Sequence, residues 1–201
     1  MKIEVAVNER AFVLVKGVPR KYLGPGVHRE WALFRHVRVE HVPTVGLLAD
    51  LDATRLKLVP AEELKLVEVS ESQRAVVYKK GVPVLWLKAG THQVWTVDRS
   101  LNRETGAQVP QIRVELLDVS GVEAKPLGDA LKAIAPVSDY VETTATAGAV
   151  ALRYVDGVFD AALPAGRHAA WNVARKVLLA PLDLRERVLE VRDLGMLIPP
   201  G

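Results

Sequence analysis

Three stretches of the chain repeat one pattern of six residues at fixed spacing: Gly-Val, then Leu, then Gly-x-His-x-x-Trp. No insertion or deletion separates the first Gly from the Trp in any copy. Such a pattern is typical of tandem repeats, in which each copy is one small unit and neighbouring copies pack together. We expect its positions to be structural, because a residue that recurs in every copy serves the copy's architecture, whereas catalytic residues tend to occur once. Besides the Val that follows the first Gly, the shared positions are Gly17, Leu23, Gly26, His28 and Trp31; Gly81, Leu87, Gly90, His92 and Trp95; and Gly157, Leu163, Gly166, His168 and Trp171.

The spacing of the copies divides the 201 residues into three modules. We place the first at 1–66, the second at 67–125 and the third at 147–201, with a connector at 126–146 that contains a short helix. A module of this size buries only about 60% of the surface of its unfolded chain and is marginal alone. We therefore expect the modules to pack against one another or against other chains.

Short apolar runs rich in β-formers precede each motif, which predicts an all-β fold with little helix. Lys16-Gly17, Lys80-Gly81 and Asp156-Gly157 then predict tight hairpin turns, because a Gly is favoured where φ is positive. A second strand ends at the shared Leu, and the His and Trp follow on a third. The sequence thus predicts that each module opens as a three-stranded antiparallel meander.

Further strands are predicted between and after the motifs, and helix is predicted at only two places. The strands are 37–42, 56–59, 64–69, 111–119, 177–182 and 187–191. The helices are a single turn at 60–64 and the stretch 129–135, where Asp129 caps the first turn and Pro136 ends the helix.

Composition narrows the classes of function. The chain has no Cys, which excludes disulfides, Cys-ligated zinc and thiol chemistry and predicts a reducing cytoplasm. No apolar run approaches the roughly 18 residues that a membrane span needs, and the N-terminus lacks the pattern of a secretion signal. Residues 1–42 carry eight Lys or Arg against four Glu, a net charge of +4, and the remainder is at −1. A basic first module could attract an anionic surface, although solvent-facing strand residues explain the charge as well.

The shared His and Trp are three positions apart, so on one strand they are expected to face opposite sides. The Trp is the better candidate for the core, and Trp31→Ala, Trp95→Ala and Trp171→Ala are each expected to destabilise the fold by about 3–5 kcal/mol. A zinc site made by His28, His92 and His168 would require three modules to converge within metal–nitrogen distances of about 2 Å. A His that forms a hydrogen bond or packs inside its own module is the favoured interpretation.

Signatures of catalysis and of cofactor binding are missing. The chain has no Gly-x-Ser-x-Gly elbow, no Gly-x-x-x-x-Gly-Lys-Ser/Thr loop and no strand-bound Gly-x-Gly-x-x-Gly. We therefore expect no enzymatic activity, no cofactor and no metal. An enzyme built from scattered carboxylates stays the least favoured alternative.

The third copy resembles the opening of the stomatin/prohibitin (SPFH, band-seven) domain of bacterial slipins. The resemblance lies in 149–157, in 163–171 and in the Leu182-Asp183-Leu184-Arg185-Glu186 string. The earlier copies, at 9–17 with 23–26 and at 73–81, are similar to the β-modules that precede that domain in some long slipins. Vault-type shell proteins are a looser match.

The resemblance implies a non-enzymatic scaffold that assembles into rings or cages, often against a membrane. Some features of the family are not in this sequence: the stomatin-like membrane hairpin, the α/β continuation after Arg185-Glu186, and a heptad stretch for an assembly helix. The chain would then correspond either to part of a longer slipin or to a shortened relative that keeps only the modules.

Two functional hypotheses remain. The first is a cytoplasmic scaffold, peripheral to a membrane or not, that self-associates as a homo-oligomer or docks to a protein partner through strand edges and module joints. The second is an adaptor whose basic first module binds anionic lipid or nucleic acid; the mild overall charge of +3 disfavours nucleic acid. Partner identity and oligomer number do not follow from the sequence.

Overall fold

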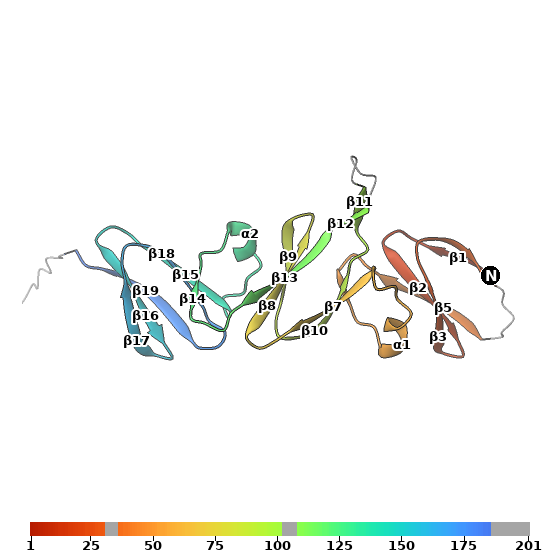
Figure 1. Ribbon diagram of the computed structural model, residues 1–201, viewed down its shortest axis with the longest axis horizontal. Helices are drawn as coiled ribbons and strands as arrows, with labels where there is room; N and C mark the ends of the chain where they lie inside the picture. Colours follow the sequence, from red (N-terminus) through yellow and green to blue (C-terminus); the bar gives the residue numbers. More distant parts are fainter. Residues whose placement is uncertain (31–35, 102–107, 186–201) are drawn as a thin grey trace, which may run out of the picture. The chain divides into compact units, whose positions relative to one another are not determined.

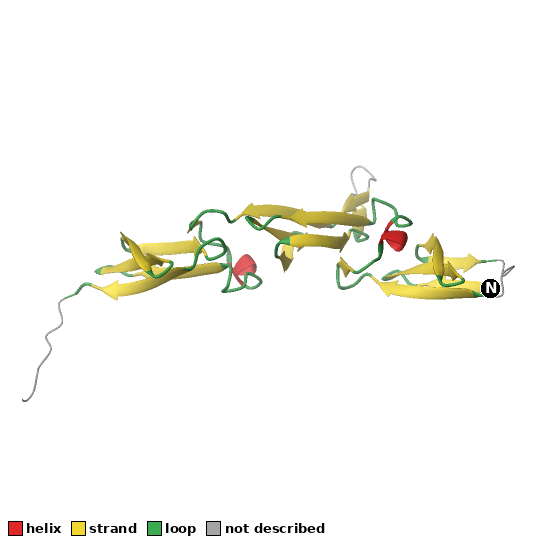
Figure 2. Ribbon diagram, turned by 90° about the horizontal axis from the view of Figure 1, so that it is seen from below, coloured by secondary structure: helices red, strands yellow, loops and turns green. Residues whose placement is uncertain are grey.

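The computed structural model describes residues 1–30, 36–101 and 108–185. Strands dominate it, and its two helices have four residues each (Figure 2). The predicted all-β fold with three related antiparallel modules is confirmed. Among the described residues, no helix has the length and apolar character needed to cross a membrane.

Each module contributes five strands in the same order (Figure 1). The first module has β1 (Lys2–Val5), β2 (Glu9–Val15), β3 (Val18–Leu23), β4 (Gly26–Arg29) and β5 (Val37–Pro43). The second has β7 (Leu64–Val69), β8 (Gln73–Lys79), β9 (Val82–Leu87), β10 (Gly90–Trp95) and β13 (Ile112–Asp118). The third has β15 (Tyr140–Ala145), β16 (Ala149–Val155), β17 (Val158–Leu163), β18 (Gly166–Trp171) and β19 (Val177–Asp183).

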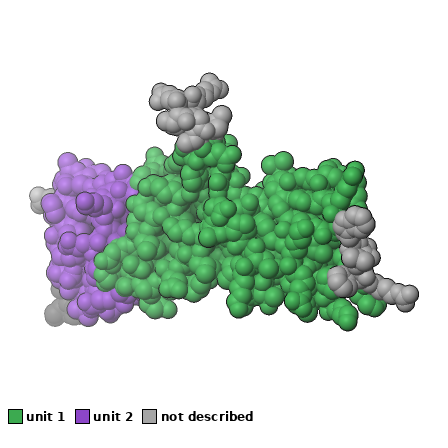
Figure 3. Space-filling model, turned by 45° about the vertical axis from the view of Figure 1, so that its right-hand side comes forward, with its two compact units in different colours: residues 1–120, 128–135 green, residues 121–127, 136–201 purple. Residues whose placement is uncertain are grey.

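The segments between modules carry the remaining elements. The first linker contains β6 (Leu48–Ala49) and α1 (Ala53–Leu56), and the second contains β14 (Glu123–Ala124) and α2 (Asp129–Lys132). A two-stranded hairpin, β11 (Arg99–Leu101) with β12 (Gln108–Pro110), extends from the second module. By the density of contacts the chain forms two compact units, 1–120 with 128–135, and 121–127 with 136–201 (Figure 3).

The structure moves the predicted module limits. The boundary between residues 66 and 67 would cut β7, which pairs along its whole length with β10 of the second module. The predicted connector 126–146 contains β15, the first strand of the third module. Each module therefore begins one strand before its motif hairpin, and the predicted third module at 147–201 lacks its first strand and extends into residues that the structure does not describe.

Each module is a pair of small sheets. The three-stranded sheets have the orders β3-β2-β5, β9-β8-β13 and β17-β16-β19, with the motif hairpin on one side of the central strand. The other sheets pair β1 with β4, β7 with β10 and β15 with β18, and the linker strands β6 and β14 extend the last two. Side chains from both sheets fill the space between them, such as Ile3, Val5, Ala11, Val13 and Leu23 in the first module.

The predicted meander is wrong in its third strand. The hairpins at Lys16-Gly17, Lys80-Gly81 and Asp156-Gly157 are confirmed, with φ near 53° and 80° in the first of them. The chain then turns at Gly26, Gly90 and Gly166, whose φ values of 131°, 135° and 148° are conformations reserved for glycine. After this turn, the strand with the His does not pair with the hairpin. It pairs in the other sheet with the first strand of its module: β4 with β1, β10 with β7 and β18 with β15.

The remaining predictions of secondary structure have mixed outcomes. Strands at 37–42, 64–69, 111–119 and 177–182 are confirmed within one residue at every end, and 187–191 lies outside the described residues. The strand predicted at 56–59 is wrong, because the Asp52 carboxylate accepts from the backbone N–H of Thr54 and Arg55 and starts α1 there. The helix predicted at 60–64 is a turn closed by Glu63 N–H to the Pro60 carbonyl. Helix α2 forms, but Gly128, not Asp129, is its N-cap.

Candidate functional site: the joint between modules

The shared histidines secure the glycine turns. The Nε2 atoms of His28, His92 and His168 lie 2.8, 2.8 and 2.7 Å from the backbone carbonyls of Gly24, Lys88 and Pro164, four residues earlier in each case. A carbonyl only accepts, so Nε2 carries the proton and donates. Each ring also lies within 4 Å of the position that a Cβ atom would take on the turn glycine. The preferred interpretation of a hydrogen-bonding His inside each module is confirmed.

The other motif positions lie where the repeat needs them. Leu23 and Leu87 are buried in their own modules, and Leu163 is half-buried. Gly17, Gly81 and Gly157 complete the hairpin turns. Trp95 is fully buried and Trp171 nearly so, whereas Trp31 lies outside the described residues.

The sequence suggested that the Trp lies in the core of its own module, but Trp95 does not. Its ring belongs to a cluster with Phe12 and Leu14 of the first module, together with Leu51 and Leu64. The preceding residue on the same strand, Val94, packs in the core of the second module. Because neighbouring strand residues face opposite sides, the indole points out of its own module and into the first. The indole N–H has no acceptor among the described residues.

This cluster is a joint that covers the outer face of the β3-β2-β5 sheet. Phe12 and Leu14 face outward, whereas Ala11 and Val13 face the core of the first module. Linker residues complete the cover, and the Leu47 carbonyl accepts from Trp95 N–H at 2.7 Å. The partly buried members are Tyr22, Val42, Ala49, Leu56, Leu58, Val59 and Val97. Both faces of β2 are therefore buried, one by its own module and one by the next.

A charged clasp closes one side of the joint. The Glu63 carboxylate, just before β7, accepts from Arg10 Nε and from the Tyr22 hydroxyl, both at 2.5 Å from the same oxygen. The Arg10 side chain is 6% exposed, and its Nη1 also donates to the carbonyls of Val7 and Glu9. Burial raises the pKa of the Tyr22 hydroxyl well above its ordinary value, and the bonded carboxylate raises it further.

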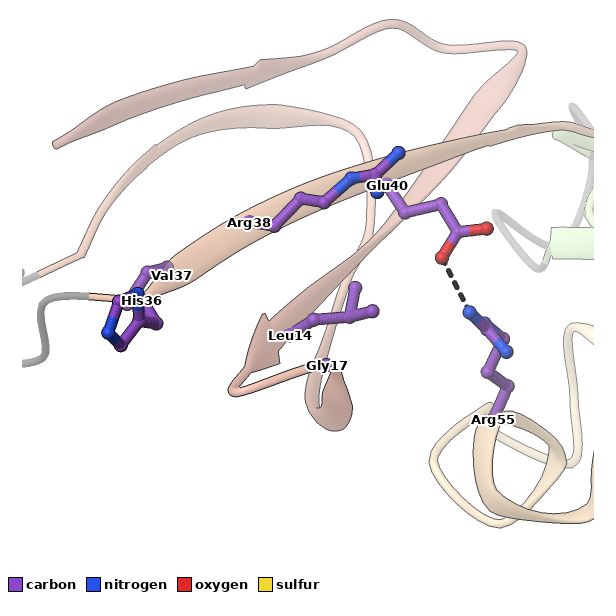
Figure 4. A pocket seen from close by; sticks show the side chains of 7 residues that line it. All are labelled: Leu14, Gly17, His36, Val37, Arg38, Glu40 and Arg55. Atoms are coloured by element: carbon purple, nitrogen blue, oxygen red, sulfur yellow. Dashed lines mark hydrogen bonds and ion pairs between the residues drawn. The ribbon is translucent and has the colours of Figure 1, made fainter.

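A second polar contact ties α1 to the same sheet (Figure 4). Arg55 donates to Glu40 of β5 at 2.6 Å and also pairs with Asp52, and its guanidinium lies 6.0 Å from the Phe12 ring. The pKa of Arg55 is raised, chiefly by the bond to Glu40. Beside this contact lies an open hollow of about 650 Å³, lined by Leu14, Gly17, His36, Val37, Arg38, Glu40 and Arg55.

The sequence pattern alone did not reveal a buried alanine in each module or the clasp of the joint. Ala11, Ala75 and Ala151 occupy one position in the three modules and are fully buried, but alanine is too common to stand out without the register. The clasp was missed because Arg10, Tyr22 and Glu63 are distant in sequence. A usable signal existed for one of them: Arg10 and Arg74 both directly precede the buried Ala.

The charged groups of the joint are paired with one another. The Glu63 carboxylate accepts from Arg10 and Tyr22, and the Glu40 carboxylate accepts from Arg55. Within residues 1–30, 36–101 and 108–185, no cluster of three His, Cys, Asp or Glu side chains is placed to hold a metal ion. What the arrangement does is bind one β-module to the next.

No protein-family model, curated protein or solved structure matches the chain.

Trp95→Ala is predicted to lower the free energy of unfolding by about 3–5 kcal/mol, because it empties the centre of the joint. The control His92→Ala removes one hydrogen bond and is predicted to cost about 0.5–1.5 kcal/mol. Urea denaturation followed by circular dichroism measures both. A double-mutant cycle with Phe12→Ala is predicted to give a coupling of at least about 0.5 kcal/mol. Additive effects of Phe12→Ala and Trp95→Ala would show that the indole does not act through the joint.

The clasp predicts a loss of stability at alkaline pH. The folded state holds the Tyr22 proton more tightly than the unfolded state, whose pKa is near 10.0. This contribution is complete below pH 10 and is lost as pH rises above it. Tyr22→Phe is therefore predicted to reduce the fall in unfolding free energy between about pH 9 and pH 11.5, as measured by urea denaturation at each pH. Equal slopes for the wild type and Tyr22→Phe would contradict the prediction.

Proposed function

We propose that the protein is a non-enzymatic scaffold of the slipin and stomatin/prohibitin type, which self-associates or docks to a protein partner through the faces and edges of its β-modules. The observation that carries the proposal is the joint: in this chain, the outer face of a three-stranded sheet is a protein-binding surface, and Phe12 and Leu14 are buried on it by another module. A fold that already uses this face for docking needs only one exposed copy of it to bind something further.

The third module supplies such a copy. On β19, Leu178 and Leu182 are 59% and 45% exposed, and Phe159 on β17 is 55% exposed. Exposed apolar patches of this kind mark interaction sites in soluble proteins. A position close to a membrane follows from the family resemblance alone, and so does the comparison with rings and cages.

Leu178→Arg is predicted to abolish self-association of the protein, and Val137→Arg is predicted to leave it unchanged. Both replace an exposed apolar side chain by a cation, but Val137, 79% exposed, lies in the linker before β15 and not on the sheet. Light scattering coupled to size exclusion, over a micromolar concentration series, is predicted to give a mass that rises above the 22.0 kDa of one chain for the wild type and for Val137→Arg. A wild type that stays at one chain's mass and binds no partner would end the scaffold proposal.

A second candidate is an adaptor that binds anionic lipid through the first module. The observation that favours it is the exposure of Lys2, Lys16, Arg20, Arg29 and Arg38. Binding of this type weakens steeply as salt screens the charges. The protein is then predicted to sediment with phosphatidylserine vesicles at low salt, but neither at high salt nor with phosphatidylcholine vesicles. Absence of sedimentation at low salt removes this candidate, and binding of a DNA duplex in its place would point to nucleic acid.

A further inference from the structure

The outer sheet face of the third module is lined mainly by apolar side chains. Tyr154 lies opposite Phe159 on one neighbouring strand and opposite Leu178 on the other. The rings of Tyr154 and Phe159 meet edge to face, with their centroids 5.9 Å apart. The adjacent rungs place Leu152 between Ala162 and Ala180, and Val150 beside Leu182. Since cross-strand neighbours share a face, these eight side chains form one surface, which we call the tail face: Val150, Leu152, Tyr154, Phe159, Ala162, Leu178, Ala180 and Leu182.

Four of these register positions carry polar side chains in the first module, and three of the four take part in the joint. Arg10 corresponds to Val150, Tyr22 to Ala162, Arg38 to Leu178 and Glu40 to Ala180. In the first module, Glu63 and Arg55 neutralise Arg10 and Glu40 as the joint forms. The tail face has lost all four polar groups. It therefore fits an apolar partner surface and requires no complementary charge.

The first module leaves one strand position open. In the second and third modules a linker strand, β6 or β14, pairs with β10 or β18 on the side away from the first strand of that module. Among the described residues, β4 pairs with β1 alone. Glu30 N–H donates to the Met1 carbonyl, so by alternation the backbone groups of Val27 and Arg29 face away from β1. We call this side of β4 the head edge.

We propose that copies of this chain associate head to tail, with the tail face of one copy docked on the first module of the next at the head edge. This inference rests on the proposed function and specifies its geometry. The joint between the first and second modules gives the precedent: there an outer sheet face is covered by Trp95, the last residue of β10, and β10 is the strand that receives the linker strand β6. Contact between unlike surfaces leaves one of each free, so the copies form open chains or closed rings.

Two variants block one surface each. Leu178→Arg blocks the tail face and places there the residue type that the first module carries at Arg38, so the sheet accommodates it. Arg29→Pro removes an outward N–H from the head edge and leaves the hydrogen bonds of β4 to β1, because proline is tolerated on the open side of an edge strand. Each variant alone is expected to remain at the 22.0 kDa of one chain where the wild type associates.

Mixing the two variants gives the decisive measurement. Arg29→Pro retains a working tail face and Leu178→Arg retains a working head edge, so an equal mixture is expected to form a complex of two chains and no larger species. Pairing of two tail faces is the alternative, and it predicts that Arg29→Pro associates by itself as the wild type does. That result, or a mixture that stays at the mass of one chain, overturns the head-to-tail inference while wild-type association still supports the scaffold.

Hydrogen exchange guards against a variant that fails to fold. In the wild type, the amides of Val27 and Arg29 are expected to become protected as concentration rises, and those of the tail-face variant Leu178→Arg are not. Protection that is independent of concentration would mean that the head edge is not a contact between copies. A wild type that remains monomeric at every concentration overturns both this inference and self-association itself.

Discussion

The central strand of each three-stranded sheet sets the constraint on which the whole arrangement depends. In β2, Ala11 and Val13 face the core of the module, and Phe12 and Leu14 face away from it, yet all four are at most 6% exposed. A single module has only one other sheet, so it can cover only one of these faces. Burying both faces removes far more apolar surface from water than one module could, and the joint with the second module follows from that need. The first two modules consequently share a buried interface and are not independent folding units.

Residues that recur and residues that differ divide the work in each module. The glycines and histidines shape the module: positive φ at Gly26, Gly90 and Gly166 turns the chain into the second sheet, and the His ring ties the turn to the carbonyl before it. The joint, by contrast, combines the shared Trp95 with side chains that are not shared by all three copies, such as Phe12 and Glu63. The desolvation of Arg10 and Glu63 offsets much of their attraction, so the clasp adds little net stability. Its effect is geometric, because one carboxylate oxygen must meet both Arg10 and Tyr22.

The sequence predicted the local features of the fold, and failed where pairing is between distant segments. Hairpins at Lys16-Gly17 and its equivalents follow from glycine, and strand limits follow from apolar alternation, so both were recoverable from local chemistry. The partner of β4 was not, because alternation marks a strand without naming its neighbour. The same limit applies to Trp95. Its face, opposite to that of His92, was predictable from their spacing, but the identity of the surface that covers it depends on the placement of another module.

The third module differs from the first on the outer face of its three-stranded sheet, the face that the joint buries in the first module. The replacement of Arg10, Tyr22, Arg38 and Glu40 by Val150, Ala162, Leu178 and Ala180 exchanges a surface matched to one charged linker for one that any apolar surface can cover. Hydrophobic burial is not directional, so such a face contributes free energy but little register. An edge strand has the complementary property, since its backbone groups fix register through hydrogen bonds but bury little apolar surface. An apolar tail face and an open head edge on one chain together supply both requirements of a specific contact.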